Sequence, residues 1–283
     1  MVNYMYDLHV HSTASDGLLT PEEVLLRAQE IGLAGIALTD HDTISGIEAA
    51  QKYRVDHGLT LEFIPGIEMN TEVDETEVHI LGYYIDHHDN RLLNKLEEIR
   101  EARLERARKM VYRLKSMGLA ISFDHVEKLA RGDLIGRPHV AQALTEKGYV
   151  FSIKEAFEKY IGKGKPAYVP RYKFLPQEAI QLIKNAGGVP VLAHPGLLRN
   201  RELIQEAINL GVAGLEVYYP DHTLEQVAEY LHLCQHYHLL VTGGSDFHGT
   251  DSDESRCRLG CTGIDLERYR QLYSYHHKKN IPS

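Results

Sequence analysis

The sequence predicts an α/β protein, a somewhat irregular (β/α) barrel of about seven strands with a small helical insertion. Short apolar runs alternate with amphipathic stretches in the first and last thirds of the chain, which favours strands connected by helices. Polar side chains suited to metal binding follow these runs, as expected of a barrel whose functional groups lie at the C-terminal ends of its strands. A central stretch without strand-like runs predicts the insertion.

The first part of the barrel is predicted from four apolar runs and two helices. The strands are expected at residues 6–11, 35–39, 61–69 and 77–85. The helix over residues 21–31 has a clear beginning, because Thr20 is placed to cap it, Pro21 suits the first helical position and Glu23 completes a capping box. A second helix is expected over residues 45–57.

Residues 90–173 are predicted to form a helical domain of their own. One long, highly charged helix is expected over residues 90–117, because its apolar residues recur on one side. Shorter helices are expected at residues 124–130, 138–147 and 153–160. The chain would thus consist of a barrel, residues 1–89 and 174–283, and a helical insertion, residues 90–173.

Alternation resumes after the insertion. Strands are expected at residues 189–194, 214–219 and 239–246. Helices are expected at residues 176–186, 201–210, 225–238 and 266–278.

The composition narrows the function classes. It is that of an ordinary globular protein, with 43% hydrophobic and 25% charged residues, and no apolar run is long enough for a membrane helix. No export signal is visible, so the cytoplasm is the predicted location. The formal net charge of −9 argues against nonspecific wrapping of a polyanion, and no binding of duplex DNA is expected.

The cysteines predict no disulfide. Cys234, Cys257 and Cys261 are an odd number without a repeated spacing, which is a poor disulfide framework. We expect free thiols in a reducing compartment.

Candidate metal ligands recur where the predicted strands end. His9 and His11 occupy alternate positions of the first strand, so their side chains project from one face. The further candidates are His41, Glu68, His79, His194, Asp246 and His248. Imidazoles together with carboxylates and without thiolate suit Mn²⁺, Fe²⁺ or Zn²⁺, and the spacing does not choose among these ions.

Four ordered motifs resemble those of the PHP (polymerase and histidinol phosphatase) family. They are Asp7-Leu8-His9-Val10-His11-Ser12, Thr39-Asp40-His41-Asp42, Ala193-His194-Pro195 and Gly244-Ser245-Asp246-Phe247-His248-Gly249. Within that family the chain is most similar to the nucleoside 3′,5′-bisphosphate phosphatases, also called RNase AM-like proteins. Their helical insertion carries Gly-Arg-Pro-His and Gly-Lys-Pro-Ala-Tyr elements, which are matched at residues 136–139 and 164–168.

The resemblance implies a distorted (β/α)7 PHP barrel that holds two or three divalent cations, with Mn²⁺ as the first expectation and Fe²⁺ or Zn²⁺ as alternatives. Glu68 would bridge two of the ions. The implied ligands are His9, His11, Glu68 and Asp246 for a first metal, Asp16, His41 and His248 for a second, and Glu68, His79 and His194 for a third.

Substrate-binding residues are expected mainly in the insertion. Pro138 at the first position of a helix would make Arg137 its N-cap, where a guanidinium beside free backbone N–H groups suits a phosphate; an exposed loop arginine is the alternative. His139 could touch the same group. Lys165 and Arg171 are weaker candidates, because charged loop residues are usually only solvated.

Two residues at or just beyond the end of the strand over residues 214–219 could act on the substrate or its leaving group. Tyr218 and His222 could orient the substrate or protonate the leaving oxygen, with His222 as the predicted catalytic residue. A surface histidine is an equally open interpretation of His222.

The predicted activity is metal-dependent hydrolysis of nucleoside 3′,5′-bisphosphates with release of the 3′-phosphate, and of short 5′-phosphorylated single-stranded oligonucleotides. A metal-activated hydroxide would attack phosphorus, and no local signature of a Ser or Cys nucleophile is present. The alternatives are a histidinol-phosphate phosphatase, a non-catalytic PHP module and, more distantly, an amidohydrolase. No membrane partner is expected, and no number of subunits is predicted.

Overall fold

The structure is a computed structural model that describes residues 5–74, 76–130, 134–249 and 257–279. The chain divides into two compact units. The barrel unit comprises Met1–Leu93 and Lys173–Ser283, and the helical unit comprises Asn94–Tyr172. In the described ranges, no helix combines the length and the apolar character that crossing a lipid bilayer requires.

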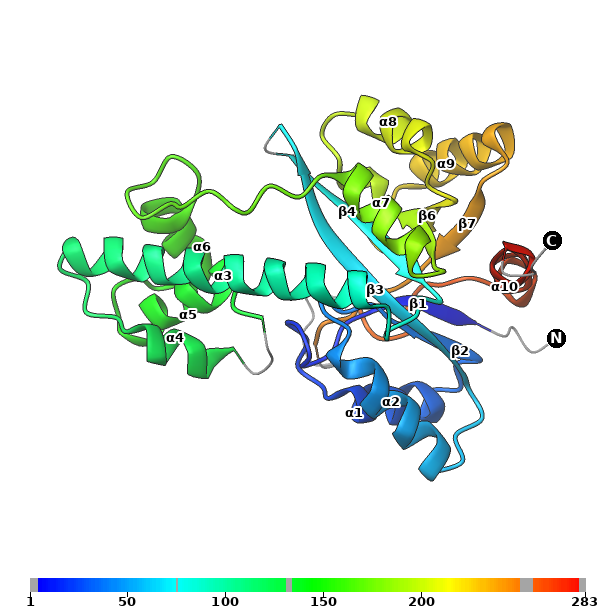
Figure 1. Cartoon of the computed structure of the whole chain (residues 1–283), viewed down its shortest axis with the longest axis horizontal. Coiled ribbons are helices and arrows are strands. Elements are labelled where there is room, and N and C mark those ends of the chain that lie inside the picture. Colours follow the sequence, from blue (N-terminus) through cyan, green and yellow to red (C-terminus); the bar gives the residue numbers. More distant parts are fainter. Residues whose placement is uncertain (1–4, 75, 131–133, 250–256, 280–283) are drawn as a thin grey trace. The chain divides into compact units, whose positions relative to one another are not determined.

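Seven strands form one sheet in the order β1 to β7, so the predicted α/β barrel is confirmed. β1, β2 and β3 run parallel, and so do β5, β6 and β7 (Figure 1). The strands are β1 (Tyr6–Val10), β2 (Gly35–Leu38), β3 (Glu62–Val73), β4 (Thr76–Tyr83), β5 (Val189–Leu192), β6 (Gly214–Tyr218) and β7 (Leu240–Gly243).

The strand β4 breaks the parallel order, since it runs antiparallel to both β3 and β5. β3 ends at Val73 and β4 begins at Thr76. A connection this short cannot make the crossover that parallel strands require, so the two strands form a hairpin. The alternation of strand and helix expected from the sequence therefore fails between these two strands, and the barrel is irregular for that reason.

The segment that follows β7 comes back to β1 and brings the two ends of the sheet together. The His11 N–H donates to the Phe247 carbonyl at 2.9 Å, and the Asp246 N–H donates to the His9 carbonyl at 2.8 Å. Gly244 permits this approach, because a Cβ there would lie 2.3 Å from the backbone nitrogen of His9. The closure places the segment after β7 directly against His9 and His11.

Helices surround the barrel strands (Figure 1). α1 packs on β2, α7 on β4, α9 on β6 and α10 on β7. The predicted capping box of α1 is confirmed: the Glu23 N–H donates to the Thr20 hydroxyl at 3.2 Å, and the Thr20 N–H donates to the Glu23 carboxylate at 2.8 Å. The helices of this unit are α1 (Pro21–Glu30), α2 (Ser45–Asp56), α7 (Pro176–Asn185), the 3₁₀ turn η2 (Pro195–Leu197), α8 (Glu202–Leu210), α9 (Leu224–Tyr237) and α10 (Leu266–Lys279).

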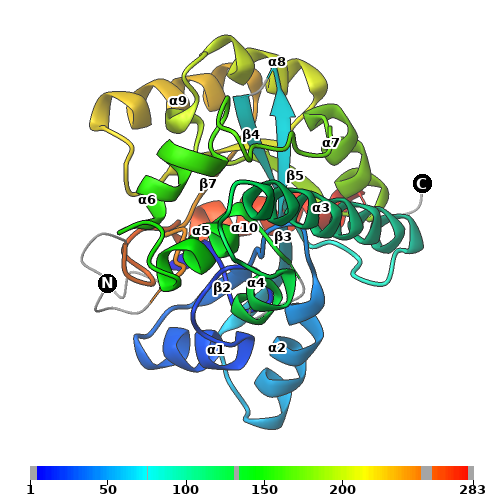
Figure 2. The ribbon, with the colours of Figure 1, turned by 90° about the vertical axis from the view of Figure 1, so that its left-hand side faces the viewer.

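The helical unit has its own core. α4, α5 and α6 gather along the C-terminal half of α3 (Figure 1 and Figure 2). Met110 and Leu114 of α3 pack with Val126, Val140 and Leu144 of the short helices, and all five side chains are buried. The helices are α3 (Asn90–Ser116), α4 (Phe123–Leu129), α5 (Arg137–Glu146), α6 (Ile153–Ala156) and the π-helix η1 (Phe157–Ile161).

The predicted beginning of α5 is wrong by one residue. Gly136 is the N-cap, Arg137 is the first helical residue and Pro138 the second. A proline fits anywhere in the first turn, where backbone N–H groups have no partner within the helix, so its presence does not locate the cap to one residue. His139 completes the cap, since its Nδ1 accepts from the Gly136 N–H at 3.0 Å.

The expectation of three free thiols is wrong as well. Cys257 and Cys261 form a disulfide, with Cα atoms 6.2 Å apart, and only Cys234 is a free, buried thiol among the described residues. The two paired cysteines lie on a turn between β7 and α10, which brings their backbones within the range usual for disulfides. The four-residue spacing by itself carried no sign of that turn.

We predict that a cavity in the barrel core lowers the stability of the protein. Leu81 of β4 is 0% exposed, so Leu81→Ala should lower the free energy of unfolding by about 2–5 kcal/mol in urea titrations. Leu224→Ala is the matched control: that side chain is 84% exposed, and its loss should change stability by less than about 0.5 kcal/mol. Equal effects of the two substitutions would contradict the described core.

Candidate metal centre

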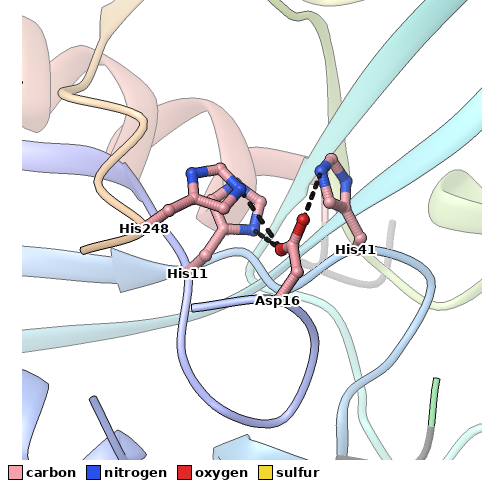
Figure 3. Close-up of side chains that lie close together, drawn as sticks. All are labelled: His11, Asp16, His41 and His248. Atoms are coloured by element: carbon pink, nitrogen blue, oxygen red, sulfur yellow. Dashed lines mark ion pairs between the residues drawn. The ribbon is translucent and has the colours of Figure 1, made fainter. Parts of the chain in front are cut away.

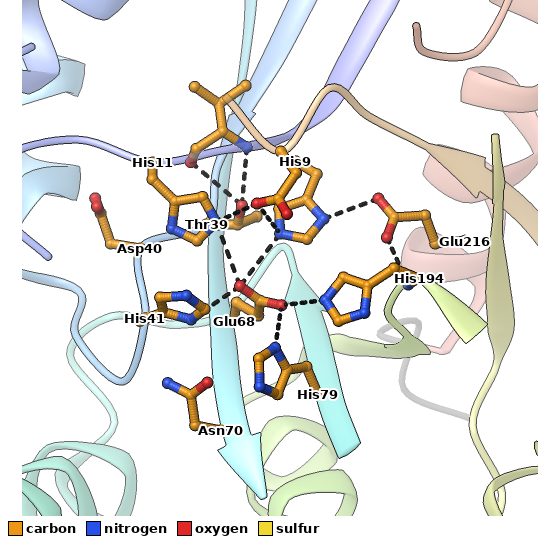
Figure 4. Close-up of polar contacts among 12 residues, drawn as sticks. His9, His11, Thr39, Asp40, His41, Glu68, Asn70, His79, His194 and Glu216 are labelled. Carbon is orange, nitrogen blue, oxygen red and sulfur yellow. Dashed lines mark hydrogen bonds and ion pairs between the residues drawn. The ribbon is translucent and has the colours of Figure 1, made fainter. Parts of the chain in front are cut away.

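A buried carboxylate, that of Glu68 in β3, lies at the centre of the candidate site. Its side chain is 1% exposed, and imidazoles surround it (Figure 4). Its two oxygens contact His41 Nδ1 at 2.9 Å, His79 Nδ1 at 2.9 Å, His194 Nε2 at 3.0 Å, His9 Nε2 at 3.2 Å and His11 Nε2 at 3.3 Å. One carboxylate thus gathers five imidazoles that come from distant parts of the sequence.

The structure brings all nine predicted ligands together at this place. Three groups of donor atoms have mutual distances within 4.8 Å, and His194 adjoins them through its contact with Glu68. Figure 3 shows the group of His11, Asp16, His41 and His248, in which Asp16 Oδ1 lies 3.2 Å from His248 Nε2. The groups are His9, His11, Glu68 and Asp246; His11, Asp16, His41 and His248; and His41, Glu68 and His79. That these residues act as ligands remains a prediction at this stage.

The unpaired atoms of the cluster fit divalent cations. Among the described residues, eleven buried side-chain nitrogen and oxygen atoms have no hydrogen-bond partner, and eight of them belong to this cluster. They include Glu68 Oε2, Asp246 Oδ1 and both ring nitrogens of His11. Several of these atoms lie close together, but their geometry is not that of a hydrogen bond. Ligand atoms that point at a common metal ion lie in this way. Mixed nitrogen and oxygen donors without thiolate match Mn²⁺, Fe²⁺ or Zn²⁺.

The charges of the cluster are strongly coupled. Burial alone would raise the pKa of the Glu68 carboxyl, but the imidazoles around it hold that pKa well below its usual value. Burial disfavours a charge on His11, yet the neighbouring carboxylates of Asp246 and Glu68 outweigh it and raise the His11 pKa to about 10. The pKa values of His9 and His41 are raised for the same reason, by neighbouring carboxylates. In the absence of a metal, protons therefore occupy nitrogens that a cation would need.

The cluster opens to solvent on one side. The side chains of His9 and His11 are 0% exposed, whereas that of Asp16 is 39% exposed. His41 and His248 are partly exposed beside Asp16. A substrate would therefore meet the cluster at the group that contains Asp16.

His79 lies in the first half of β4, not at its end as the sequence predicts. The C-terminal-end rule applies to parallel strands, and β4 runs the other way. Glu68 also lies inside its strand, because β3 continues to Val73 in the hairpin with β4. The antiparallel hairpin is thus what carries both residues to the cluster.

The aspartates of the sequence motifs join neighbouring segments of the chain. Asp40 accepts hydrogen bonds from Ser12 and Ser15, which hold the loop between His11 and Asp16. Asp42 accepts two hydrogen bonds from Asn70 of β3.

Asp7 joins the two ends of the barrel in the same way. It accepts from the Ser245 N–H and hydroxyl and from the Gly260 N–H. Burial raises its pKa to about 6, although these hydrogen bonds oppose the shift. Asp7, Asp40 and Asp42 therefore fix the backbone next to the histidines and lie outside the three donor groups.

Two candidate ligands have backbones that few non-glycine residues adopt. The φ angle is +26° at His194 and +53° at Asp246. Such left-handed conformations cost free energy and persist only where the surroundings enforce them, which is common at functional sites.

Tyr219 and Glu216 are neighbours of the cluster that the sequence analysis missed. The Tyr219 hydroxyl donates to Asp246 Oδ2 at 3.0 Å. Tyr218, the residue expected from the sequence, instead has its ring beside the Arg268 guanidinium at 5.2 Å; it is the last residue of β6, and Tyr219 follows the strand. Glu216 is 0% exposed and contacts His9 Nδ1 at 2.9 Å. A charged residue within an otherwise apolar strand was the available signal for Glu216.

The ring nitrogens of His222 are both occupied. Nε2 accepts from the Gly196 N–H at 3.0 Å, so Nδ1 carries the proton and donates it to the Val217 carbonyl at 2.9 Å. Burial lowers the His222 pKa. In this arrangement the ring ties the turn after His194 to β6, and this geometry favours a positioning role over the predicted proton transfer.

The predicted residues of the helical unit include a cluster of cations. Burial, together with repulsion from Arg137 and Arg171, lowers the pKa of the Arg106 guanidinium to about 10. Arg106 also donates to the Val169 carbonyl at 2.8 Å. Lys165 lies in the turn after η1, where its backbone N–H bonds the Gly162 carbonyl. Two of the predicted residues therefore share a cationic neighbourhood with Arg106, which the sequence analysis did not single out.

Comparisons with known proteins identify the family of this chain. The PHP domain family matches residues 7–189. The chain belongs to the PHP family. The 5'-3' exoribonuclease Rnm of Escherichia coli (strain K12) is 36% identical over 250 residues, which cover 86% of this chain and 85% of the relative. The 3',5'-nucleoside bisphosphate phosphatase of Chromobacterium violaceum is 37% identical over 248 residues, which cover 86% of each protein.

A solved structure gives the same result for the fold. A protein of Bifidobacterium adolescentis assigned as a metal-dependent phosphoesterase superposes with a TM-score of 0.83 and 32% sequence identity, and the match covers 95% of each chain. The predicted membership in the PHP family is therefore confirmed.

We predict that this PHP centre exchanges protons for metal. Because the pKa values of His9, His11 and His41 are raised without metal, these imidazoles hold protons at neutral pH and must release them to bind a cation. Affinity for Mn²⁺ should rise with pH, about tenfold per pH unit for each proton displaced, up to pH values near those pKa values. Calorimetric titrations in buffers with different ionisation enthalpies would count the protons. Binding that is independent of pH between 6 and 8 would contradict the described charges.

Proposed function

We propose that this PHP protein hydrolyses nucleoside 3′,5′-bisphosphates, with release of the 3′-phosphate, and also short single-stranded oligonucleotides that carry a 5′-phosphate. The observation that carries the proposal is the buried Glu68 carboxylate with five imidazoles around it and Asp16 and Asp246 at the flanks. Two relatives named for such activities, at 36% and 37% identity, support it. We also propose that the protein acts in the cytoplasm.

The centre would hold two or three divalent ions, and we propose Mn²⁺ as the native metal. Bound ions would polarise the phosphoryl oxygens and make water a competent nucleophile near neutral pH. Glu68 would bridge two of the ions. The first would be held by His9, His11, Glu68 and Asp246, the second by Asp16, His41 and His248, and the third by Glu68, His79 and His194.

The residues of the chain would hold the reacting groups in place. Asp16 and His41 lie on the exposed side of the cluster, so the scissile phosphate would approach there. The Tyr219 hydroxyl would keep Asp246 oriented through its hydrogen bond. His222 would hold the turn next to His194, because both of its ring nitrogens bond the backbone.

The phosphate that is not hydrolysed needs cations of its own. We propose that Arg137 and Arg171 bind it, with His139 and Lys165 in support, and that residues 90–173 cap the substrate. Arg137 opens helix α5, where free N–H groups and the helix dipole favour an anion. The positive charges of Arg137 and Arg171 act on Arg106, and a phosphate bound among these side chains would offset that repulsion. These three arginines would favour doubly phosphorylated substrates over histidinol phosphate, which has a single phosphate.

We predict that the protein loaded with Mn²⁺ releases phosphate from adenosine 3′,5′-bisphosphate much faster than from histidinol phosphate. His41→Ala should lower that rate by at least about 100-fold, because it removes a metal ligand from the exposed group. Phosphate release followed with malachite green would measure both.

The matched control for this assay is His57→Ala. His57 is an exposed histidine at the end of α2, so its loss should leave the rate unchanged. A preference for histidinol phosphate would replace the proposed substrate class, and near-normal activity of His41→Ala would remove His41 from the metal ligands.

We predict that Arg137→Ala raises KM for adenosine 3′,5′-bisphosphate by about 10- to 100-fold, which corresponds to a charge-assisted hydrogen bond. Hydrolysis of p-nitrophenyl phosphate, which has a single phosphate, should change by less than about threefold. Arg100→Ala serves as the control, since Arg100 pairs with Glu97 on the surface of α3. Equal losses on the two substrates would contradict the proposed role of Arg137.

A further inference from the structure

The buried carboxylate of Glu216 connects two parts of the metal centre. Its side chain extends from β6 and is 0% exposed. Figure 4 shows it between His9 and His194. Oε1 lies 2.9 Å from His9 Nδ1, and Oε2 accepts the His194 backbone N–H at 2.7 Å.

Glu216 determines which nitrogen of His9 carries a proton. A carboxylate only accepts hydrogen bonds, so His9 Nδ1 must be the donor in this contact. Nε2 is then the nitrogen that faces Glu68 Oε2 at 3.2 Å and Asp246 Oδ1 at 3.3 Å. When metal binding displaces the second proton of His9, Nδ1 therefore keeps its proton, and the lone pair of Nε2 becomes available to a cation in the cluster.

The second oxygen of Glu216 acts on the backbone of His194. That residue has a φ of +26°, which a non-glycine residue adopts only when its surroundings enforce it. The hydrogen bond at 2.7 Å holds its N–H, while His194 Nε2 contacts Glu68 Oε1 at 3.0 Å. One side chain therefore controls the protonation of one candidate ligand and the backbone of another.

We propose that Glu216 is a positioning residue that holds His9 in its metal-binding tautomer and His194 in its strained conformation, so that both can bind metal. This inference rests on the metal centre of the proposed function. It assigns a role to a residue that lies outside the three donor groups.

The substitution Glu216→Gln tests this role with almost no change of shape. A glutamine amide has one acceptor and one donor end, but its two partners are both donors. The backbone N–H of His194 cannot change, whereas the imidazole can. The amide oxygen should therefore bond His194, and the amide NH₂ should face His9 Nδ1 and move the His9 proton to Nε2, where it blocks metal binding.

We predict that Glu216→Gln binds Mn²⁺ about 10- to 100-fold more weakly than the wild-type protein, as changes behind a ligand typically do. Equilibrium dialysis against Mn²⁺ with elemental analysis would measure this, and circular dichroism would verify the fold. Glu225→Gln, an exposed carboxylate in the first turn of α9, should bind like the wild type.

The outcomes separate this inference from the proposed function. Wild-type affinity in Glu216→Gln would overturn the role of Glu216 and leave the proposed function standing. A wild-type protein that binds no Mn²⁺ would overturn both.

The wild-type protein offers a second test that does not require a folded variant. In protein loaded with Zn²⁺, long-range ¹H–¹⁵N correlation spectra should show the His9 proton on Nδ1. A proton on Nε2 would overturn the inference.

Discussion

The structure depends on one interaction, the burial of the Glu68 carboxylate among five imidazoles. A carboxylate removed from water is costly unless positive charge or donors surround it. The chain supplies histidines for this purpose, and the raised pKa values of His9, His11 and His41 indicate that protons compensate the carboxylates where no cation does. A divalent ion performs the same compensation and frees those protons. The centre is therefore organised around charge that only protons or metal ions can balance.

Hydrogen bonds elsewhere in the barrel unit hold the backbone next to Glu68 and its histidines in place. Asp7 joins the segment after β7 to β1, Asp40 holds the loop that follows His11, and Asp42 fixes β3 next to Glu68. Each is a buried acceptor whose partners come from a different segment of the chain. Buried polar networks of this kind rigidify a site when every member is satisfied. The backbone at His194 and Asp246 lies in a left-handed conformation, and such strain is expected to persist where the surroundings enforce it.

Much of this could be predicted from the sequence, because the period of two in strands and the spacing of motifs place side chains directly. His9 of β1 and His11, which directly follows that strand, both contact Glu68, and the capping box of α1 is visible in three residues. The reversal of β4 follows only from the length of the link between β3 and β4, so the position of His79 within its strand could not be anticipated from alternation. Contacts between distant segments, such as Glu216 with His9 and Tyr219 with Asp246, depend on how the barrel closes. Local pattern does not contain that information.

Anomalous X-ray diffraction from crystals of protein loaded with Mn²⁺ is the most direct test of the central claim. We predict two or three strong anomalous peaks around the Glu68 carboxylate, at least one of them in contact with His9, His11 and Asp246. Peaks elsewhere on the chain, or none within coordination distance of Glu68 at saturating Mn²⁺, would contradict the account.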